Sequence, residues 1–327
     1  MQKFIIRRFL SIIPTILGVS LVVFFMIHLA PGDPVTLMVG EDATPADIER
    51  IQAIYGFDQP LHIQYIRWFG NAIQGDFGTS IRQSRPVMSL IWERAGATVE
   101  LAFMGMFIAL LISIPLGVLS AIRRGSWIDI GAMTLALIGI SMPRFWVGLM
   151  LLIYVGLNFD FFPLFGREAS LFRGFFTFFT TLNPQELITG FRHLLLPAFA
   201  LGTAATALQT RLMRSSMLEV LQQDYVRTAK SKGLSDRVVT FKHAFRNALL
   251  PVVTIVGLQF GYLLAGAVVV ETVFSWPGVA RLIINGVSQR DFPIVQAGTL
   301  LVAISFALIN LIVDISYGFL NPKIRYD

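Results

Sequence analysis

The stretch TVELAFMGMFIALLISIPLGVLSAI, residues Thr98–Ile122, runs for 25 positions with one charged side chain, Glu100. A bilayer core about 30 Å thick is crossed by roughly 20 apolar residues in a helix, so this stretch predicts a transmembrane helix. Five further stretches of the same character bring the number of predicted spans to six. In chain order the predicted spans are Phe9–Ala30, Thr98–Ile122, Ile130–Leu157, His193–Met213, Ala248–Val270 and Ile294–Phe319.

The composition of the 327-residue chain favours an all-α integral membrane protein. Its residues are 55% apolar and 14% charged, whereas soluble proteins average about 25% charged residues. This deficit argues against a soluble enzyme. The chain has no cysteine, which excludes a disulfide framework, a thiolate metal site and a cysteine nucleophile.

Lysine and arginine are distributed unevenly between the two sides of the predicted spans. With the N-terminus inside, the inner segments hold 15 basic residues and the outer segments hold 10. Cytoplasmic segments of membrane proteins carry such an excess, so both termini are predicted to be cytoplasmic. The net charge of +6 is then a topology signal, and no nucleic-acid partner is expected.

These spans divide the chain into five regions. Residues 1–30 hold the N-terminal tail and the first span, and residues 31–97 form an extracytoplasmic segment. Residues 98–213 hold spans two to four with an outer loop at 158–192. Residues 214–247 form a cytoplasmic loop, and residues 248–327 hold spans five and six around an outer segment at 271–293.

The extracytoplasmic segment is predicted to contain two short helices. Thr44 is a plausible N-cap with Pro45 at the first helical position, and Gly56 would end that helix. A second helix would start at Pro60. This segment either caps the span ends or serves as a docking surface outside the cell.

The cytoplasmic loop combines a basic composition with helical periodicity. Leu218, Leu221, Tyr225 and Ala229 recur at helical spacing, which predicts one helix over about 217–232. Gly233 is placed as its C-terminal cap. Ser235 would cap a second helix, which runs into span five and has the apolar line Val238, Phe241, Phe245 and Leu249. The hairpin either covers the bundle or acts as a lever between a partner and the membrane.

Sequence motifs for catalysis are absent. There is no P-loop sequence, no H-E-x-x-H and no G-x-S-x-G. The four histidines are not spaced as metal ligands, so no protein-built metal site is expected. If ATP drives this protein, ATP and Mg²⁺ are expected on other chains, with no cofactor here.

Arg144 is the one full positive charge deep in a predicted span. It follows Pro143, which predicts a tilt or kink in span three. Because a charge there is costly, Arg144 should face the protein interior or a wet cavity. It forms an internal ion pair, with Asp314 or Glu100, or it contacts a substrate carboxylate. The predicted pathway residues are Arg144, Gln259, Asn310 and Asp314.

Several motifs occur in one order along the whole chain. They are Pro31-Gly32-Asp33-Pro34, Phe57-Asp58-Gln59-Pro60-Leu61, Gly75-Asp76-Phe77-Gly78-Thr79-Ser80-Ile81-Arg82, the run Asp224–Leu234, Arg246-Asn247-Ala248-Leu249-Leu250-Pro251, Phe274-Ser275-Trp276-Pro277-Gly278, Arg290-Asp291-Phe292-Pro293 and Asn321-Pro322-Lys323-Ile324-Arg325-Tyr326. With them the chain resembles the membrane permease subunits of the peptide, glutathione and nickel branch of binding-protein-dependent ABC importers.

This resemblance implies a type I ABC importer permease fold in a bacterial inner membrane. It implies four kinds of partner besides lipid: a homologous second permease, two ABC ATPases and an extracytoplasmic binding protein. The cytoplasmic helix would sit in an ATPase groove, where the small Ala229 allows close approach. The implied ATPase-coupling residues are Leu221, Asp224, Tyr225, Arg227, Thr228, Ala229, Lys230, Lys232, Gly233 and Leu234.

The outer segment 271–293 reads as a short helix that suits an outer gate, a binding-protein contact or a plain cap. The candidate residues on the outer side are Asp76, Trp276, Pro277 and Gly278.

Four functions compete on these grounds. The leading hypothesis is uptake of small peptides, without enzymatic activity in this chain. Uptake of a nickel chelate or glutathione by the same machinery is an alternative. An ion-coupled secondary carrier is a remote alternative, since no inverted repeat is visible. An intramembrane hydrolase would need a catalytic pair that the sequence does not offer.

Overall fold

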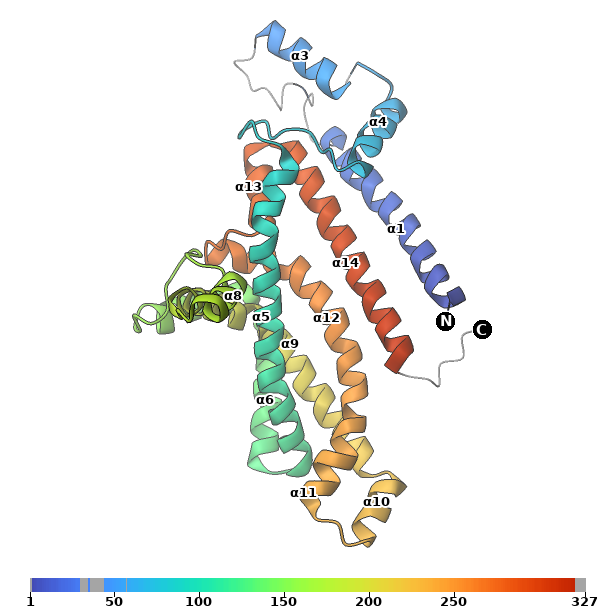
Figure 1. Cartoon of the computed structure of the whole chain (residues 1–327), viewed down its shortest axis with the longest axis vertical. Coiled ribbons are helices and arrows are strands. Elements are labelled where there is room, and N and C mark those ends of the chain that lie inside the picture. The colour runs from blue at the N-terminus through green and yellow to red at the C-terminus, as the bar shows by residue number, and fades with distance from the viewer. Residues whose placement is uncertain (1, 30–34, 36–43, 57, 321–327) are drawn as a thin grey trace. The chain divides into compact units, whose positions relative to one another are not determined.

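The structure, a computed structural model, describes residues 2–29, 35, 44–56 and 58–320, and the described part is built of helices (Figure 1). Three of the family motifs therefore lie outside the described residues wholly or in part: Pro31–Pro34, Phe57 and Asn321–Tyr326. The N-terminal helices are α1 (Gln2–Leu29), α3 (Pro45–Tyr55), α4 (Leu61–Ile73) and α5 (Val87–Ile122). The central ones are α6 (Trp127–Ser141), α7 (Arg144–Leu151), the π-helix η1 (Leu152–Gly156), α8 (Leu171–Thr181) and α9 (Gln185–Leu221). The remainder are α10 (Asp224–Ser231), α11 (Asp236–Val238), the π-helix η2 (Val239–Ala244), α12 (Phe245–Val273), α13 (Val279–Gln289) and α14 (Phe292–Leu320).

Five of these helical stretches are long and apolar enough to cross a bilayer. They are Ile6–Met26, Val87–Ile122, Gln185–Leu221, Asp236–Val273 and Phe292–Ile315. The bent pair α6 and α7–η1 gives the sixth predicted span if it is counted as one. The all-helical architecture is as the sequence predicted, and five of the six predicted spans fall on these five helices.

The third predicted span, Ile130–Leu157, differs from the prediction of a tilted or kinked helix. Its two halves, Trp127–Ser141 and Arg144–Gly156, are bent by 107° from one another. Met142 and Pro143 are both extended, with ψ angles of 127° and 138°. Because proline disfavours the α conformation of the residue before it, the helix stops at Ser141 and restarts at Arg144.

The first outer helix agrees with its predicted ends. α3 begins at Pro45, and Gly56, immediately after its last residue, has a φ of +67°. Pro60 precedes α4 as its N-cap residue.

The chain forms two compact units, which are described separately. The first contains the residues up to Thr98 together with Pro277–Leu308. Its core gathers side chains from the segment before α5, from α5 itself, from α13 and from α14. These core residues are Phe77, Val87, Leu90, Ile91, Val279, Leu282, Ile294, Ala297 and Leu300.

A buried carboxylate joins two distant motifs inside this first unit. Asp291 is fully buried and accepts hydrogen bonds from the Ser80 hydroxyl and from the backbone N–H groups of Ile81 (3.3 Å) and Arg82 (3.2 Å). The Arg82 side chain donates to the Gln289 carbonyl at 3.0 Å. A buried charge needs such partners, so the loop before α5 is fixed to the junction of α13 and α14.

The second unit contains Val99–Trp276 and the end of α14 from Ile309, with α9 packed against α6, α7, α8 and α12. Small residues bring α5 and α9 close together. A Cβ atom built on Gly202 would lie 2.5 Å from the Gly105 carbonyl oxygen. One built on Gly117 would lie 2.6 Å from the Met213 Cβ. Small residues allow this backbone approach between membrane helices.

An ion pair joins α6 to α9 in this second unit. Arg214 on α9 binds Asp129 on α6 through two hydrogen bonds of 2.5 and 2.7 Å. Asp129 also accepts from the backbone N–H of Gly125 at 2.9 Å, and its own N–H donates to the N-cap residue Ser126. The turn between α5 and α6 is thereby tied to α9.

Candidate functional site

The predicted hairpin exists, but its first helix is broken. α9 continues from the fourth span to Leu221, and a separate helix, α10, runs from Asp224 to Ser231. Gln223 is extended between them, with ψ of 149°. The prediction of one helix over 217–232 is therefore wrong. Leu218 and Leu221 belong to the end of the span helix, and α10 turns away from it.

The inner face of α10 is formed by Val226 and Ala229. Both are buried, Ala229 with 8% of its surface exposed, and they pack against Val239 of η2. Val220 and Leu221 of α9 complete this small core. Ala229 was expected to allow close approach to an ATPase. In the structure its small size also fits it inside the hairpin, where a larger side chain would push α10 off η2, and the approach to an ATPase stays a prediction.

Gly233 ends α10 in a double hydrogen-bonded turn. Its φ is +79°, its N–H donates to the Lys230 carbonyl at 2.9 Å, and the Leu234 N–H donates to the Ala229 carbonyl at 3.4 Å. This is the Schellman pattern, which favours glycine at the left-handed position. The predicted cap at Gly233 is thus confirmed in its conformation.

Gly233 should tolerate alanine poorly even though the space around it is open. No atom lies within 4 Å of a Cβ built there, so strain arises from the positive φ alone and amounts to about 1 kcal/mol. We expect Gly233→Ala to lower transport and the resistance of the hairpin to limited proteolysis. Gly125→Ala is the matched control, since Gly125 has a φ of +77° and equally open surroundings. Equal loss of transport in both variants would contradict a special role of the hairpin.

The second hairpin helix is continuous with the fifth span. α11, η2 and α12 form one helical stretch, Asp236–Val273. Ser235 precedes it, but its side chain makes no capping hydrogen bond. The π-turn of η2 adds a residue to the helical repeat and changes which side chains face inward. Val238 and Phe241 of the predicted apolar line are exposed, Phe241 by 59%, whereas Val239, Ala244, Ala248 and Val252 are buried.

Polar contacts hold the hairpin together on its outer surface. Asn247 donates to the Tyr225 hydroxyl at 2.7 Å and to the His243 carbonyl at 3.2 Å. Lys230 and Asp236 form an ion pair at 3.4 Å across the turn.

Most of the predicted coupling residues share the outer surface of this hairpin. Leu221 is half-buried and Ala229 is buried, whereas eight are exposed: Asp224, Tyr225, Arg227, Thr228, Lys230, Lys232, Gly233 and Leu234. The exposed apolar side chains Tyr225, Leu234, Val238 and Phe241 belong to the same hairpin. Exposed apolar groups of this kind mark a surface for protein contact. The sequence did not predict Val238 and Phe241 to be surface residues, because their helical spacing indicated that they face inward.

The membrane-spanning part of the second unit holds the predicted pathway residues. Arg144, the first residue of α7, is half-buried. Its guanidinium donates to the Gly266 carbonyl on α12 at 3.3 Å. In the part of the chain that the structure describes, no acid lies within ion-pair distance of Arg144. Glu100 instead pairs with Arg167 at 2.8 Å, so the predicted pairing with Glu100 is wrong.

Gln259 belongs to a polar chain that the sequence did not reveal. Gln209 of α9 is fully buried and donates to the Gln259 side-chain oxygen on α12 at 2.6 Å. The Ser113 hydroxyl of α5 donates to the Gln209 oxygen at 3.1 Å. These three side chains link the helices α5, α9 and α12. Gln209 is one of several polar residues in this part of α9, with Thr206 and Thr210 close by, so only its partners distinguish it.

The other two pathway candidates lie on the last part of α14. Asn310 and Asp314 are half-buried, and the buried side-chain oxygen of Asn310 has no hydrogen-bond partner among the described residues. A hollow of about 490 Å³ opens between α5, α12 and this part of α14. Its lining is apolar: Phe103, Met106, Phe107, Leu110, Val256, Gly257, Phe260, Ile309, Ile312 and Val313.

The outer-side candidates differ in accessibility. Asp76 is exposed and accepts from the Gly78 N–H at 2.8 Å, which shapes the predicted turn. Trp276 is completely buried, with the Arg167 guanidinium 5.8 Å from its ring centre. Its ring is therefore no surface contact in this conformation. Gly278, which caps α13, is buried, and Pro277 is half-buried.

Comparisons with known proteins agree over the full chain. The family described as the binding-protein-dependent transport system inner membrane component matches residues 113–326, and its N-terminal counterpart matches residues 1–102. The dipeptide transport system permease protein DppB of Escherichia coli K12 is 43% identical, covering 100% of this chain and 99% of that protein. The oligopeptide transport system permease protein AppB of Bacillus subtilis is 44% identical, and the glutathione transport system permease protein GsiC of Salmonella paratyphi A is 40% identical. Each of these two matches covers 100% of both chains.

Proposed function

This chain belongs to the binding-protein-dependent transport system inner membrane components, and we propose that it is the permease of an ATP-driven importer of small peptides. The observation that carries the proposal is the sequence identity of 43–44% to dipeptide and oligopeptide permeases over complete chains. The chain is a multi-pass membrane subunit without catalytic activity of its own.

The partners of this permease follow from the proposal. A homologous second permease completes the translocation pathway, and an extracytoplasmic binding protein delivers the peptide. Two ATPase chains hold ATP and Mg²⁺ and hydrolyse the nucleotide. The exposed surface of the Gly233 hairpin suits contact with one of these ATPases, because it presents apolar and charged side chains together.

The hairpin is built to transmit a movement into the membrane. Its inner core joins the end of α9 to η2, and η2 continues into α12. A movement of α10 is therefore transmitted to two membrane helices, α9 and α12. Closure of the ATPase pair would rotate the spans and open the pathway outward, and nucleotide release would return it inward. Such alternating access uses two discrete packing arrangements.

The peptide proposal is tested by uptake in cells. A strain lacking this chain should lose uptake of a radiolabelled dipeptide and regain it when the chain is restored. Unlabelled dipeptide should compete with the label, and glutathione and nickel should not. Undiminished dipeptide uptake without the chain would overturn the proposal.

Glutathione is the second candidate substrate, because one relative that matches end to end is named as a glutathione permease. Loss of glutathione uptake in the deletion strain, with dipeptide uptake intact, would favour this substrate.

The proposed orientation places both termini and the Gly233 hairpin in the cytoplasm. The natural absence of cysteine makes labelling by an impermeant thiol reagent a direct test. We expect Gln83→Cys to be labelled from outside and Ser231→Cys to be protected until the cells are opened. Both positions are exposed on the chain, so burial would not produce the difference. The reverse pattern would contradict the orientation.

A further inference from the structure

The helix α8 (Leu171–Thr181), between the third and fourth spans, has three distinct faces. One face is aromatic and exposed: Phe172, Phe175, Phe176 and Phe179, with Phe176 exposed by 70%. The second face is polar, with Arg173, Thr177 and Thr180. The third face contains the buried residue Gly174. At 100° per residue the three faces are separated by roughly 120°.

The packed face of α8 is in backbone contact with α9. A Cβ built on Gly174 would lie 2.6 Å from the Leu187 backbone nitrogen, and one on Gly190 would lie 3.0 Å from that of Leu171. Arg173 on α8 also pairs with Glu186 on α9 at 3.0 Å. The contact leaves no room for rotation, so the aromatic face keeps one direction.

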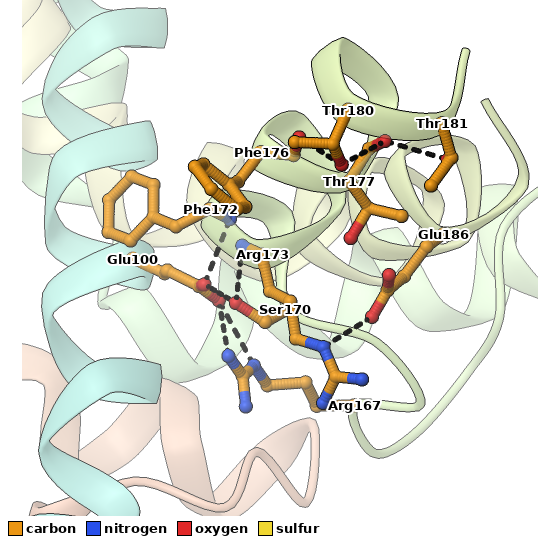
Figure 2. A network of polar contacts seen from close by, with 10 residues as sticks. All are labelled: Glu100, Arg167, Ser170, Phe172, Arg173, Phe176, Thr177, Thr180, Thr181 and Glu186. Atoms are coloured by element: carbon orange, nitrogen blue, oxygen red, sulfur yellow. Dashed lines mark hydrogen bonds and ion pairs between the residues drawn. The ribbon is translucent and has the colours of Figure 1, made fainter. Parts of the chain in front are cut away.

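The start of α8 is fixed to α5 by a buried carboxylate (Figure 2). Glu100, exposed by 1%, accepts from Arg167 at 2.8 and 3.0 Å, from the Ser170 hydroxyl and from the Phe172 N–H at 3.1 Å. Figure 2 shows α8 beginning beside α5 and running away from it. The helix is thus held across the direction of a span rather than along it.

Two spans give the depth of α8 in the bilayer independently. Roughly 20 helical residues cross the hydrocarbon core. Counted back from Ile122, where α5 ends before Arg123 and Arg124, this length reaches Ala102, next to the Glu100 network. Counted back from Arg211 on α9, it reaches Phe191, beside the Gly174 and Gly190 contact. Both counts place α8 at the far boundary of the hydrocarbon core.

The aromatic face continues the apolar surface of a span. Phe103 on α5 is half exposed, and its ring lies 5.9 Å from that of Phe172 in an edge-on contact. The four exposed phenylalanines of α8 carry no polar atom in their side chains, whereas the polar face carries the exposed Arg173. An interfacial helix needs this combination of an apolar face and a charged or polar face.

We propose that α8 lies in the outer interface of the bilayer, with its aromatic face among the lipid acyl chains and its polar face at the headgroups and water. Its third face anchors it to α9. The helix thereby fixes the depth of the outer ends of α5 and α9 against the membrane.

Spin labels on the assembled complex in lipid nanodiscs test this placement. Nitroxides at Phe176→Cys and Phe179→Cys should collide readily with oxygen, which concentrates in lipid, and poorly with a water-soluble nickel chelate. The matched control is Thr177→Cys, on the polar face of the same helix and about 160° around it from Phe179, where the preference should reverse. The complex with the unaltered chain gives the background labelling of the partner chains.

Each other outcome contradicts the proposal. A label at Phe176 that neither reagent reaches would show that a protein partner covers the face. A label that the nickel chelate reaches freely would show that the face is in water. If the phenylalanine variants fail to assemble, Leu182→Cys, at an exposed position directly after α8, must give the lipid pattern for the proposal to stand.

Discussion

A chain carrying Ala229→Arg is expected to insert into the membrane, lose its ATPase partners on purification and transport no peptide. Ala229 is buried against Val226 and Val239 inside the hairpin, and a guanidinium has no partner there. Burial of an unpaired charge costs several kcal/mol, which exceeds what the small hairpin core can supply. α10 would therefore leave η2, and the surface formed by its exposed side chains would be lost.

Ser231→Arg is the matched control for this substitution. Ser231 lies two residues further along α10, on the exposed side, so the same charge is placed in water. We expect this variant to keep the folded hairpin, with unaltered resistance to limited proteolysis, which the Ala229→Arg chain should lose. Transport by the Ala229→Arg chain at the level of the unaltered chain would remove the hairpin from the coupling mechanism.

Replacement of Arg144 should reduce peptide transport and leave the assembly of the complex unchanged. In the described residues Arg144 has no acidic partner and donates to the Gly266 carbonyl. Its loss therefore leaves no buried acid alone, and we expect Arg144→Ala to assemble with normal yield. Peptide uptake should fall by about 10- to 100-fold, since hydrogen bonds to charged groups contribute about 1.5–3 kcal/mol. Arg144→Lys should restore uptake only partly, because lysine lacks the planar fork that binds a carboxylate.

A second variant displaces the charge without removing it. A Cβ on Gly266 would lie 1.9 Å from an Arg144 guanidinium nitrogen, so Gly266→Ala forces that side chain to move. We expect a reduced uptake in this variant too, with normal assembly. A fully active Arg144→Ala complex would exclude Arg144 from the pathway, and a complex that fails to assemble would indicate a structural role.

The sequence predicted the spans well because their signal is local. An apolar run of sufficient length specifies a membrane helix without any knowledge of its neighbours. The course of the chain at proline was harder to predict. Pro14, Pro115, Pro197 and Pro251 all lie inside continuous helices, whereas Pro143 is extended and a new helix starts directly after it. All five are prolines in apolar surroundings, and only the packing of the flanking helices distinguishes them.

The hairpin illustrates a second limit. Its position and its Gly233 turn followed from periodicity and residue type. Five of the predicted inward-facing residues do pack inward: Leu218, Leu221, Ala229, Phe245 and Leu249. Tyr225, Val238 and Phe241 are exposed instead, because the break at Gln223 and the π-turn of η2 each shift the helical phase. A spacing rule assumes a constant 3.6 residues per turn, and it fails wherever the helix departs from that value.

Contacts between residues far apart in the sequence were the hardest to predict. Glu100 was considered as a partner of Arg144, yet it binds Arg167 and the start of α8. Asp291 and Ser80 are 211 positions apart and both belong to recognisable motifs. Sequence alone gives no reason to join them, because a carboxylate accepts equally well from many donors.

The two close contacts between α5 and α9 determine which parts of the second unit can move. Gly105 meets Gly202, and Gly117 meets Met213, about 18 Å further along α5 at 1.5 Å per residue. Two helices touching at one point can pivot about it, but helices touching at two separated points cannot. We therefore expect α5 and α9 to move together as one rigid pair of helices. A displacement of the hairpin would be transmitted along this rigid pair of helices, and the structure would bend at the break between Ser141 and Arg144.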